Sequence, residues 1–164
     1  MTPRTLHQQM YRNDTITAAE IAEALKHGRH KKDLTFEELR LSSGFALQSR
    51  VDLWALNVAP SAGNAADAYE IKVSRSDFRR DSHKKQRGAR LFSDRFWYVA
   101  PVGVIPHEDV PDWAGLIECE WYANGKHKPY LRLREVISAP KRDKDGPTWG
   151  LVVSLLRHAM KGGK

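Results

Sequence analysis

The first part of the chain carries short periodic patterns of apolar residues that alternate between helix and strand. Residues 14–29 place apolar side chains at helical spacing, and Thr17 followed by Glu20 is typical of a capping box at a helix start. Short apolar segments bounded by turn-forming residues then predict strands at 34–41, 51–58 and 68–73. Because only a short loop separates the last two segments, we expect them to pair as a hairpin.

The elements that follow predict a parallel crossover. Ser74 is a candidate N-cap, so the basic stretch after it should begin as a helix, which we expect to break near Ser82. Residues 95–100 form the strongest strand pattern in the chain. A strand, a helical connection and a further strand imply parallel pairing, so residues 70–100 are interpreted as a βαβ unit. The predicted fold class is α/β.

The last part of the chain predicts a second hairpin and a final helix. Two strands, 115–122 and 130–136, are expected to pair around the turn residues Asn124–Gly125. A helix should begin after Pro147. Its apolar residues recur at helical spacing on one face, formed by Trp149, Val152, Val153, Leu156 and Met160. We expect Trp149 and the aromatic residues of the strands, such as Tyr130, to lie in the core.

Composition places the chain among ordinary globular proteins. It has 164 residues, 41% of them hydrophobic and 29% charged, which suits one domain with its own core. No stretch approaches the ~20 apolar residues of a membrane span and the first residues lack an apolar signal segment, so we expect a cytoplasmic protein. Cys119 lies in an apolar strand pattern, which predicts a buried position rather than a nucleophile. The sequence shows neither the histidine spacing of a zinc protease nor a G-x-S-x-G serine motif.

Positive charge is concentrated directly after the predicted strand 68–73. The chain carries 27 Lys and Arg against 20 Asp and Glu, a net charge of +7. Residues 75–90 contain seven basic residues against Asp77 and Asp81, so 7 minus 2 gives +5 of that total. Such a concentration favours a polyanionic partner, although a solvated helix face would carry the same pattern.

Charged residues also lie inside two predicted strands, where burial is costly unless they are paired. Side chains alternate along a strand, so Glu70 and Lys72 should share one face, roughly 7 Å apart at their Cα atoms. If Asp52 on the neighbouring strand faces the same way, two carboxylates and one ammonium meet at one rim of the sheet. The carboxylates and the Ile71 carbonyl would suit Mg²⁺, which prefers oxygen ligands. From these residues alone, a structural ion-pair cluster is an equal alternative.

The same residues resemble a known family. Asp52, then Glu70-x-Lys72 on the next strand, followed by a helix and a strong strand, is similar to the PD-(D/E)XK nuclease superfamily. Val51 stands where the motif often has proline, a departure that the superfamily tolerates. An acid-x-Lys triplet alone occurs by chance in many proteins, and it is the combined pattern that carries the resemblance.

Longer runs extend this resemblance. Residues 68–78 and 93–101 are similar to MmcB-type DNA-repair proteins and related small phage proteins, and the likeness covers residues 35–101. It implies a restriction-endonuclease-like mixed sheet in αβββαβ order, flanked by helices. The core would span residues 14–101, with 102–164 adding a hairpin and a C-terminal helix to a single domain.

The resemblance also implies a function and a set of site residues. It predicts a nuclease that hydrolyses DNA phosphodiester bonds with Mg²⁺, or with Mn²⁺ as substitute, in repair, recombination or phage DNA processing. The catalytic residues would be Asp52, Glu70, Lys72 and Glu38, the last preferred to the helix residues Glu20 and Glu23. The metal ligands would be Asp52, Glu70 and Ile71. The DNA-binding residues would be Ser74, Arg75, Arg79, Lys84, Lys85 and Arg87.

The expected partner is duplex or branched DNA. One small domain with one site would cut one strand at a time, so a homodimer would suit cleavage of a duplex. Two other functions fit the same residues: a non-catalytic DNA-binding accessory module built on the nuclease scaffold, and an RNA-processing nuclease. The sequence contains no base-reading motif that would indicate sequence specificity.

Overall fold

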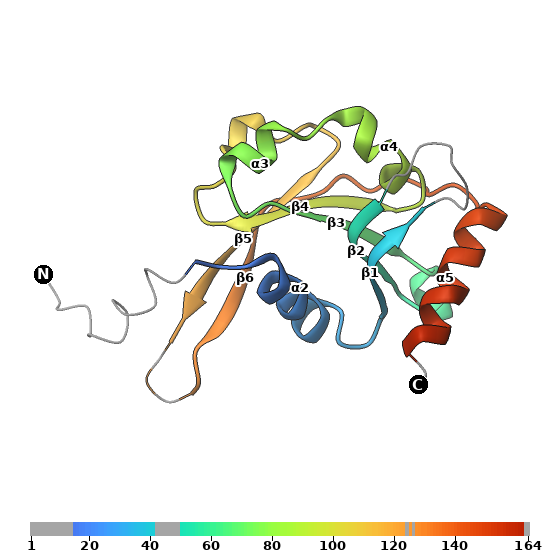
Figure 1. The fold of residues 1–164 in the computed structure, drawn as a ribbon, viewed down its shortest axis with the longest axis horizontal. Coiled ribbons are helices and arrows are strands. Elements are labelled where there is room, and N and C mark those ends of the chain that lie inside the picture. Colours follow the sequence, from blue (N-terminus) through green and yellow to red (C-terminus); the bar gives the residue numbers. More distant parts are fainter. Residues whose placement is uncertain (1–14, 42–49, 124, 126, 163–164) are drawn as a thin grey trace, which may run out of the picture.

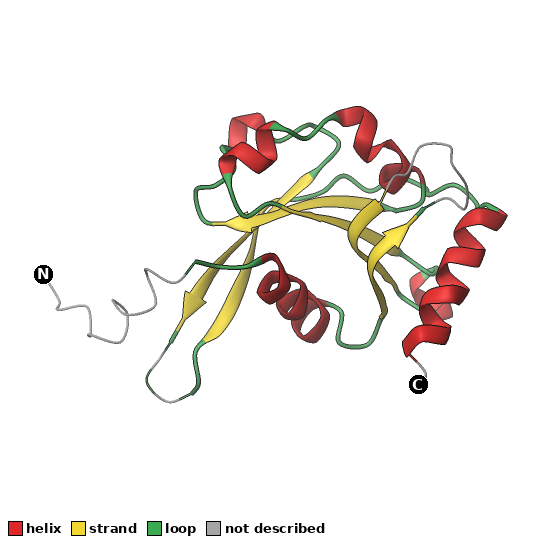
Figure 2. Cartoon of the chain, in the orientation of Figure 1, coloured by secondary structure: helices red, strands yellow, loops and turns green. Residues whose placement is uncertain are grey.

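The protein is an α/β structure in which six strands form one mixed sheet flanked by helices (Figure 1, Figure 2). This computed structural model describes residues 15–41, 50–123, 125 and 127–162, and gives only the backbone of residues 83 and 84. The strands are β1 (Leu34–Arg40), β2 (Arg50–Leu56), β3 (Ala66–Ile71), β4 (Arg95–Pro101), β5 (Gly115–Tyr122) and β6 (Tyr130–Ile137). The α-helices are α2 (Ala18–Ala24), α3 (Arg75–Arg79), α4 (His83–Leu91) and α5 (Trp149–Gly162).

Strand order in the sheet follows the order of the strands in the chain. Antiparallel pairing joins β1 to β2, β2 to β3 and β5 to β6, whereas β3, β4 and β5 pair in parallel. Both predicted hairpins and the predicted βαβ crossover are therefore confirmed. Gly125 lies in the second hairpin turn with a φ of 74°, a left-handed conformation that glycine adopts without steric cost.

Helices cover the two faces of the sheet and produce two cores. On one face, α4 and α5 pack over Trp54, Phe96, Tyr98 and Leu116. On the other face, α2 packs over residues of the same strands, including Tyr69 and Trp97. Side chains alternate between the faces of a strand, so β3 and β4 contribute to both cores and are buried along most of their length.

Local signals place most helix starts correctly. Thr17 and Glu20 form the predicted capping box at the start of α2, which continues as the π-helical turn η2 (Leu25–Arg29). The basic stretch breaks as predicted, since Ser74 caps α3 and Ser82 caps α4. Two short 3₁₀ helices, η3 (Pro60–Ala62) and η4 (His107–Asp109), lie in the connecting loops. The described helices include none that is both long and apolar enough to cross a bilayer.

Strand ends differ from the prediction by a few residues. β2 spans Arg50–Leu56 rather than 51–58, and β3 spans Ala66–Ile71 rather than 68–73. Val73, the last residue of the predicted strand 68–73, is exposed because β3 ends before it. Cys119 is buried, as predicted, and burial raises the pKa of its thiol to about 12, which makes it a poor nucleophile.

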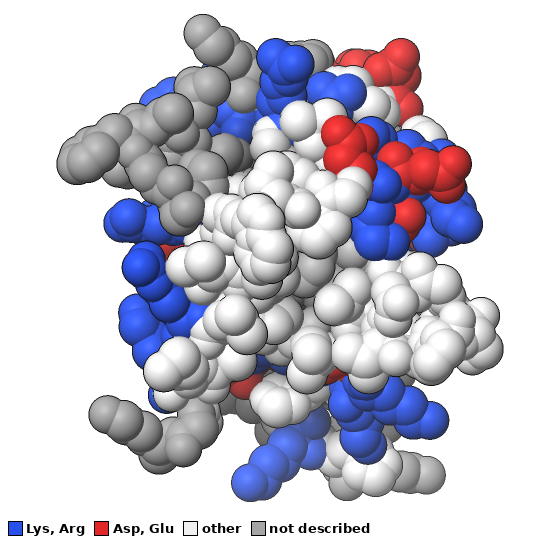
Figure 3. Space-filling view, turned by 90° about the vertical axis from the view of Figure 1, so that its right-hand side faces the viewer, with Lys and Arg blue, Asp and Glu red and all other residues white. Residues whose placement is uncertain are grey.

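The predicted face of the C-terminal helix was wrong, although the helix itself is present. Leu151 and Leu155 of α5 pack into the core, whereas Trp149 is 83% exposed and Met160 75% exposed. Tyr130, also predicted to be in the core, is 51% exposed. Figure 3 shows a broad uncharged surface on the side of the molecule that carries α5. Helical spacing identified an apolar stripe correctly, but the helix packs on the sheet through a neighbouring stripe.

Candidate active site

Glu70 and Lys72 form a buried ion pair at the end of β3. Each residue is 3% exposed, and Nζ of Lys72 donates to Oε1 of Glu70 over 2.8 Å. Both side chains lie on the face covered by α4 and Tyr98, while Tyr69 and Ile71 point into the opposite core. The predicted sharing of one face is confirmed. The pair was predicted at the rim of the sheet, but it is buried because the helices that follow β3 cover it.

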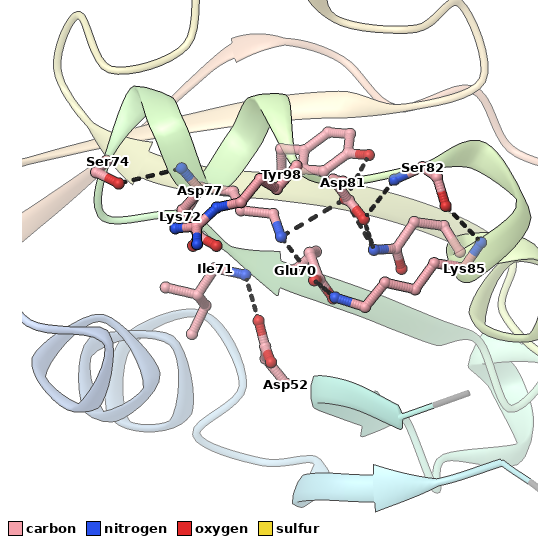
Figure 4. A network of polar contacts seen from close by, with 12 residues as sticks. Asp52, Glu70, Ile71, Lys72, Ser74, Asp77, Asp81, Ser82, Lys85 and Tyr98 are labelled. Atoms are coloured by element: carbon pink, nitrogen blue, oxygen red, sulfur yellow. Dashed lines mark hydrogen bonds and ion pairs between the residues drawn. The ribbon is translucent and has the colours of Figure 1, made fainter. Parts of the chain in front are cut away.

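Asp52 on β2 reaches the same end of β3 through the backbone of Ile71. Backbone pairing between β2 and β3 runs only as far as Leu53 and Tyr69. Beyond that point, Oδ2 of Asp52 accepts a hydrogen bond from the Ile71 amide at 2.7 Å. The carboxylate thus takes the place of a ladder carbonyl and is held at the strand end (Figure 4).

The electrostatics of these three residues are strongly coupled. Burial raises the pKa of Asp52, with a contribution from the nearby charge of Glu38. Burial likewise raises the pKa of Glu70, and the charge of Asp52 adds to it. Burial alone would lower the pKa of Lys72, but its hydrogen bond to Glu70 and the surrounding carboxylates outweigh that effect and raise it. Two mutually repelling carboxylates therefore lie beside one firmly charged ammonium.

A fourth charged residue, Asp81, completes the group. It lies between α3 and α4, its side chain is 4% exposed, and its Oδ2 is 3.6 Å from Nζ of Lys72. The Gln86 amide donates to both of its oxygens at 2.9 and 2.8 Å, and the Tyr98 hydroxyl donates to Oδ2 at 3.1 Å. These residues were not predicted as part of the site, because in the sequence Asp81 is only an acid within a basic stretch. No periodicity signals that the helix break folds it back over β3.

Lys85 links the group to the basic helices. Its Nζ lies 3.5 Å from Oε1 of Glu70, and its side chain is 56% exposed. Of the other predicted DNA-binding residues, Arg75, Arg79 and Arg87 are exposed on α3 and α4, on the same face of the sheet as the ion pair. Ser74 uses its hydroxyl to cap α3 by accepting from the Asp77 amide at 3.2 Å. Lys84 was also predicted to bind DNA, and its side chain lies outside the described part of the structure.

Glu38 stands apart from the group. Its carboxylate pairs with Arg50 at 2.7 Å, and its side chain is 55% exposed. Pairing of β1 with β2 is interrupted at this residue, whose φ of 51° is uncommon for a residue other than glycine. Its charge contributes to the raised pKa of Asp52, but no direct contact joins the two carboxylates. The structure therefore brings together Asp52, Glu70 and Lys72, with Glu38 near enough for its charge to act on Asp52.

The donor atoms at this site fit a hard divalent cation held largely by water. Within the described residues, Oε2 of Glu70 is buried and has no hydrogen-bond partner. A cation there would engage that oxygen and offset the repulsion that raises the carboxylate pKa values. The described part of the chain holds no group of three or more His, Cys, Asp or Glu side chains arranged for a metal. Mg²⁺ is commonly held by one or two carboxylates together with waters and substrate phosphates, and Asp52 and Glu70 are the carboxylates that would hold it here.

Comparisons with protein-family models, with curated proteins and with solved structures found no match to this chain. The geometry of the site, together with the fold around it, therefore carries the functional interpretation.

Proposed function

We propose that this protein is a Mg²⁺-dependent nuclease that hydrolyses DNA phosphodiester bonds. The observation that carries the proposal is the buried pair Glu70–Lys72 beside Asp52, with an unpartnered carboxylate oxygen, next to exposed basic helices. A purely structural ion pair has no need of a second, partly buried carboxylate whose repulsion raises the pKa of the first. Perturbed carboxylates of this kind are typical of functional sites.

The order of elements supports a restriction-endonuclease-like fold. One helix, three antiparallel strands, a helical connection and a parallel strand follow each other as α2, β1, β2, β3, α3 with α4, and β4. This is the αβββαβ order of the PD-(D/E)XK nuclease superfamily. The residue types of Asp52 on β2, and of Glu70 and Lys72 at the end of β3, support the resemblance to its motif.

Each group has a distinct task in the proposed reaction. Asp52, Glu70 and the Ile71 carbonyl would hold Mg²⁺, which when bound polarises a phosphoryl oxygen and lowers the pKa of a coordinated water. The Lys72 ammonium, kept protonated by its carboxylate neighbours, neutralises negative charge that develops on the phosphoryl group. Lys85 and the exposed arginines of α3 and α4 bind phosphates of the backbone close to the scissile bond.

Cleavage assays on defined substrates test the proposal. Plasmid, linear duplex, single-stranded and branched DNA are incubated with Mg²⁺ or Mn²⁺, alongside single-stranded and duplex RNA. We expect DNA cleavage that falls at least about 100-fold in Asp52→Asn and Glu70→Gln, because both remove a metal-binding charge. Asp145→Asn, which removes an exposed carboxylate far along the chain, is the matched control and should cut normally. Binding without cleavage of any substrate overturns the enzymatic proposal, and preferential cleavage of RNA overturns its choice of substrate.

One observation favours a second function, a non-catalytic DNA-binding module on the same scaffold. Of the three carboxylates predicted to be catalytic, Asp52 and Glu70 lie at the end of β3, whereas the carboxylate of Glu38 pairs with Arg50. In such a module the basic helices alone would bind DNA. Its affinity would fall steeply with salt and would be the same in the wild type and in Asp52→Asn, as measured by fluorescence anisotropy.

A further inference from the structure

Asp81 is the most completely engaged carboxylate in the site, and no other feature of the proposed reaction uses it. Its Oδ1 accepts from the Ser82 amide and from Gln86, and its Oδ2 accepts from Gln86 and Tyr98. Gln86 is 1% exposed and Tyr98 3% exposed, so these donors are themselves fixed by the core. The carboxylate is therefore held rigidly between α3 and α4.

Among the contacts that the structure describes for Asp81, one is with a charged side chain, that of Lys72 (Figure 4). Nζ of Lys72 lies 2.8 Å from Oε1 of Glu70 and 3.6 Å from Oδ2 of Asp81, so the ammonium stands between two carboxylates. Their environments differ. Asp81 has donors on both oxygens, whereas Glu70 has one oxygen that is buried without a partner.

We propose that Asp81 is a positioning residue that shares the Lys72 ammonium with Glu70 and thereby leaves the Glu70 carboxylate available to a divalent cation. Without a second acceptor, the ammonium would be bound to Glu70 alone and would compete there with the metal. With Asp81 fixed by Gln86 and Tyr98, Lys72 keeps a partner when Glu70 engages the cation. Lys72 then stays in place for the phosphoryl group. This inference rests on the proposed function and adds a residue to its site.

Mn²⁺ binding, measured by calorimetry on the full chain, tests the inference without any cleavage. Asp81→Asn keeps an acceptor for the Tyr98 hydroxyl but removes the charge that attracts Lys72. We expect Mn²⁺ affinity to fall about 10-fold, the lower end of what loss of an outer-sphere partner costs. Asp77→Asn is the matched control, because Asp77 lies on the neighbouring helix α3 and its charge also acts on Lys72, whereas the ion pairs described for Lys72 are those with Glu70 and Asp81. It should bind Mn²⁺ as the wild type does.

The Lys72→Met background separates positioning from a direct effect of the Asp81 charge on the metal. If Asp81 acts through Lys72, adding Asp81→Asn to Lys72→Met leaves Mn²⁺ affinity unchanged. A further 10-fold loss in that background, or a loss in Asp77→Asn equal to that in Asp81→Asn, overturns the inference. Tyr98→Phe removes one hydrogen bond to Asp81 and keeps the Asp81 charge. It should lower Mn²⁺ affinity by about 2-fold to 3-fold, and it provides a second test if Asp81→Asn does not fold.

Cleavage kinetics provide a second readout that distinguishes the two proposals. Where the wild type cleaves DNA, Asp81→Asn should lower kcat about 10-fold at saturating Mn²⁺ and leave KM for DNA unchanged, since Asp81 lies behind Lys72 rather than on the DNA surface. If the wild type binds Mn²⁺ but cuts nothing, the nuclease proposal fails while the Mn²⁺ cycle still decides the role of Asp81. If the wild type does not bind Mn²⁺, both proposals are overturned.

Discussion

Replacing Lys72 with methionine should destabilise the protein far more than replacing Glu70, its nearest carboxylate partner, with glutamine. Methionine keeps the length of the side chain, so the change removes a buried charge without leaving a large cavity. Glu70 and Asp81, whose side chains are 3% and 4% exposed, then lose the ammonium at 2.8 and 3.6 Å. Removing one partner of a buried ion pair costs about 3 to 5 kcal/mol, because the remaining charge is left uncompensated.

One nearby cation reduces this cost only slightly. Lys85 lies 3.5 Å from Glu70, but its side chain is 56% exposed, and pairs with exposed partners contribute about 0 to 1 kcal/mol. We therefore expect Lys72→Met to lose about 3 kcal/mol at pH 7.5, which for a chain of this size lowers Tm by roughly 9 °C. Glu70→Gln removes one of the mutually repelling carboxylates instead, and should change stability by less than about 1 kcal/mol.

Urea denaturation in EDTA, followed by tryptophan fluorescence, measures the difference. The loss in Lys72→Met should shrink at pH 5, because the unpaired carboxylates can then take up protons. Lys85→Met serves as the control, since it removes an exposed ammonium from the same site and should cost less than about 1 kcal/mol. A Lys72→Met protein within about 0.5 kcal/mol of the wild type, or a loss shared equally by Glu70→Gln, would refute the account of a buried lysine that compensates several carboxylates.

Three further predictions concern the metal, the pH dependence and the packing of the sheet. Mn²⁺ at 100 times its Kd should stabilise the wild type by about 2.7 kcal/mol in thermal unfolding, and should leave Tm of Asp52→Asn unchanged; an equal shift in both would place the ion elsewhere. Because the folded-state pKa values of Asp52 and Glu70 are raised, their contribution to stability is fully present below the ordinary pKa values of these acids and is lost as pH rises through the raised ones. Metal-free Asp52→Asn should therefore be the more stable protein at pH 7, with a flatter profile of stability against pH, and a steeper profile would contradict the raised pKa. Gly115→Ala should cost about 3 kcal/mol in urea, because the added Cβ would lie 2.5 Å from the Trp97 ring and 2.6 Å from the Ala139 backbone nitrogen. Gly146→Ala, with open space around it, is its control.

Much of the architecture was predictable because its signals are local. Capping residues at Thr17, Ser74 and Ser82 act within one helical turn, and each marks a helix start that the structure confirms. Alternation along β3 correctly placed Glu70 and Lys72 on one face. Strand ends were less accurate, since the last residues of a strand depend on whether a neighbouring strand extends far enough to pair with them.

Other features depended on contacts that no local pattern encodes. Trp149 lies on an apolar stripe of α5, but the sheet receives Leu151 and Leu155 from the same helix, because the orientation of a docked helix depends on the shape of the surface below it. Glu38 was expected in the site from its strand position. Its backbone is left-handed where the pairing of β1 with β2 is interrupted, and its carboxylate pairs with Arg50, so it acts on Asp52 through its charge.

The sequence by itself determined the order of helices and strands, the basic stretch after β3 and the acid-x-Lys pattern at the end of that strand. These properties reside in residues a few positions apart, whose spacing sets their direction whatever surrounds them. Only the tertiary structure decided that the Glu70–Lys72 pair is buried, that Asp52 caps the Ile71 amide and that Asp81 reaches Lys72. The burial of the pair and the reach of Asp81 depend on how the broken helix folds back over the sheet, whereas the Asp52 contact depends on where the pairing of β2 with β3 ends. The cost of burying charge favours a partner for each of these groups.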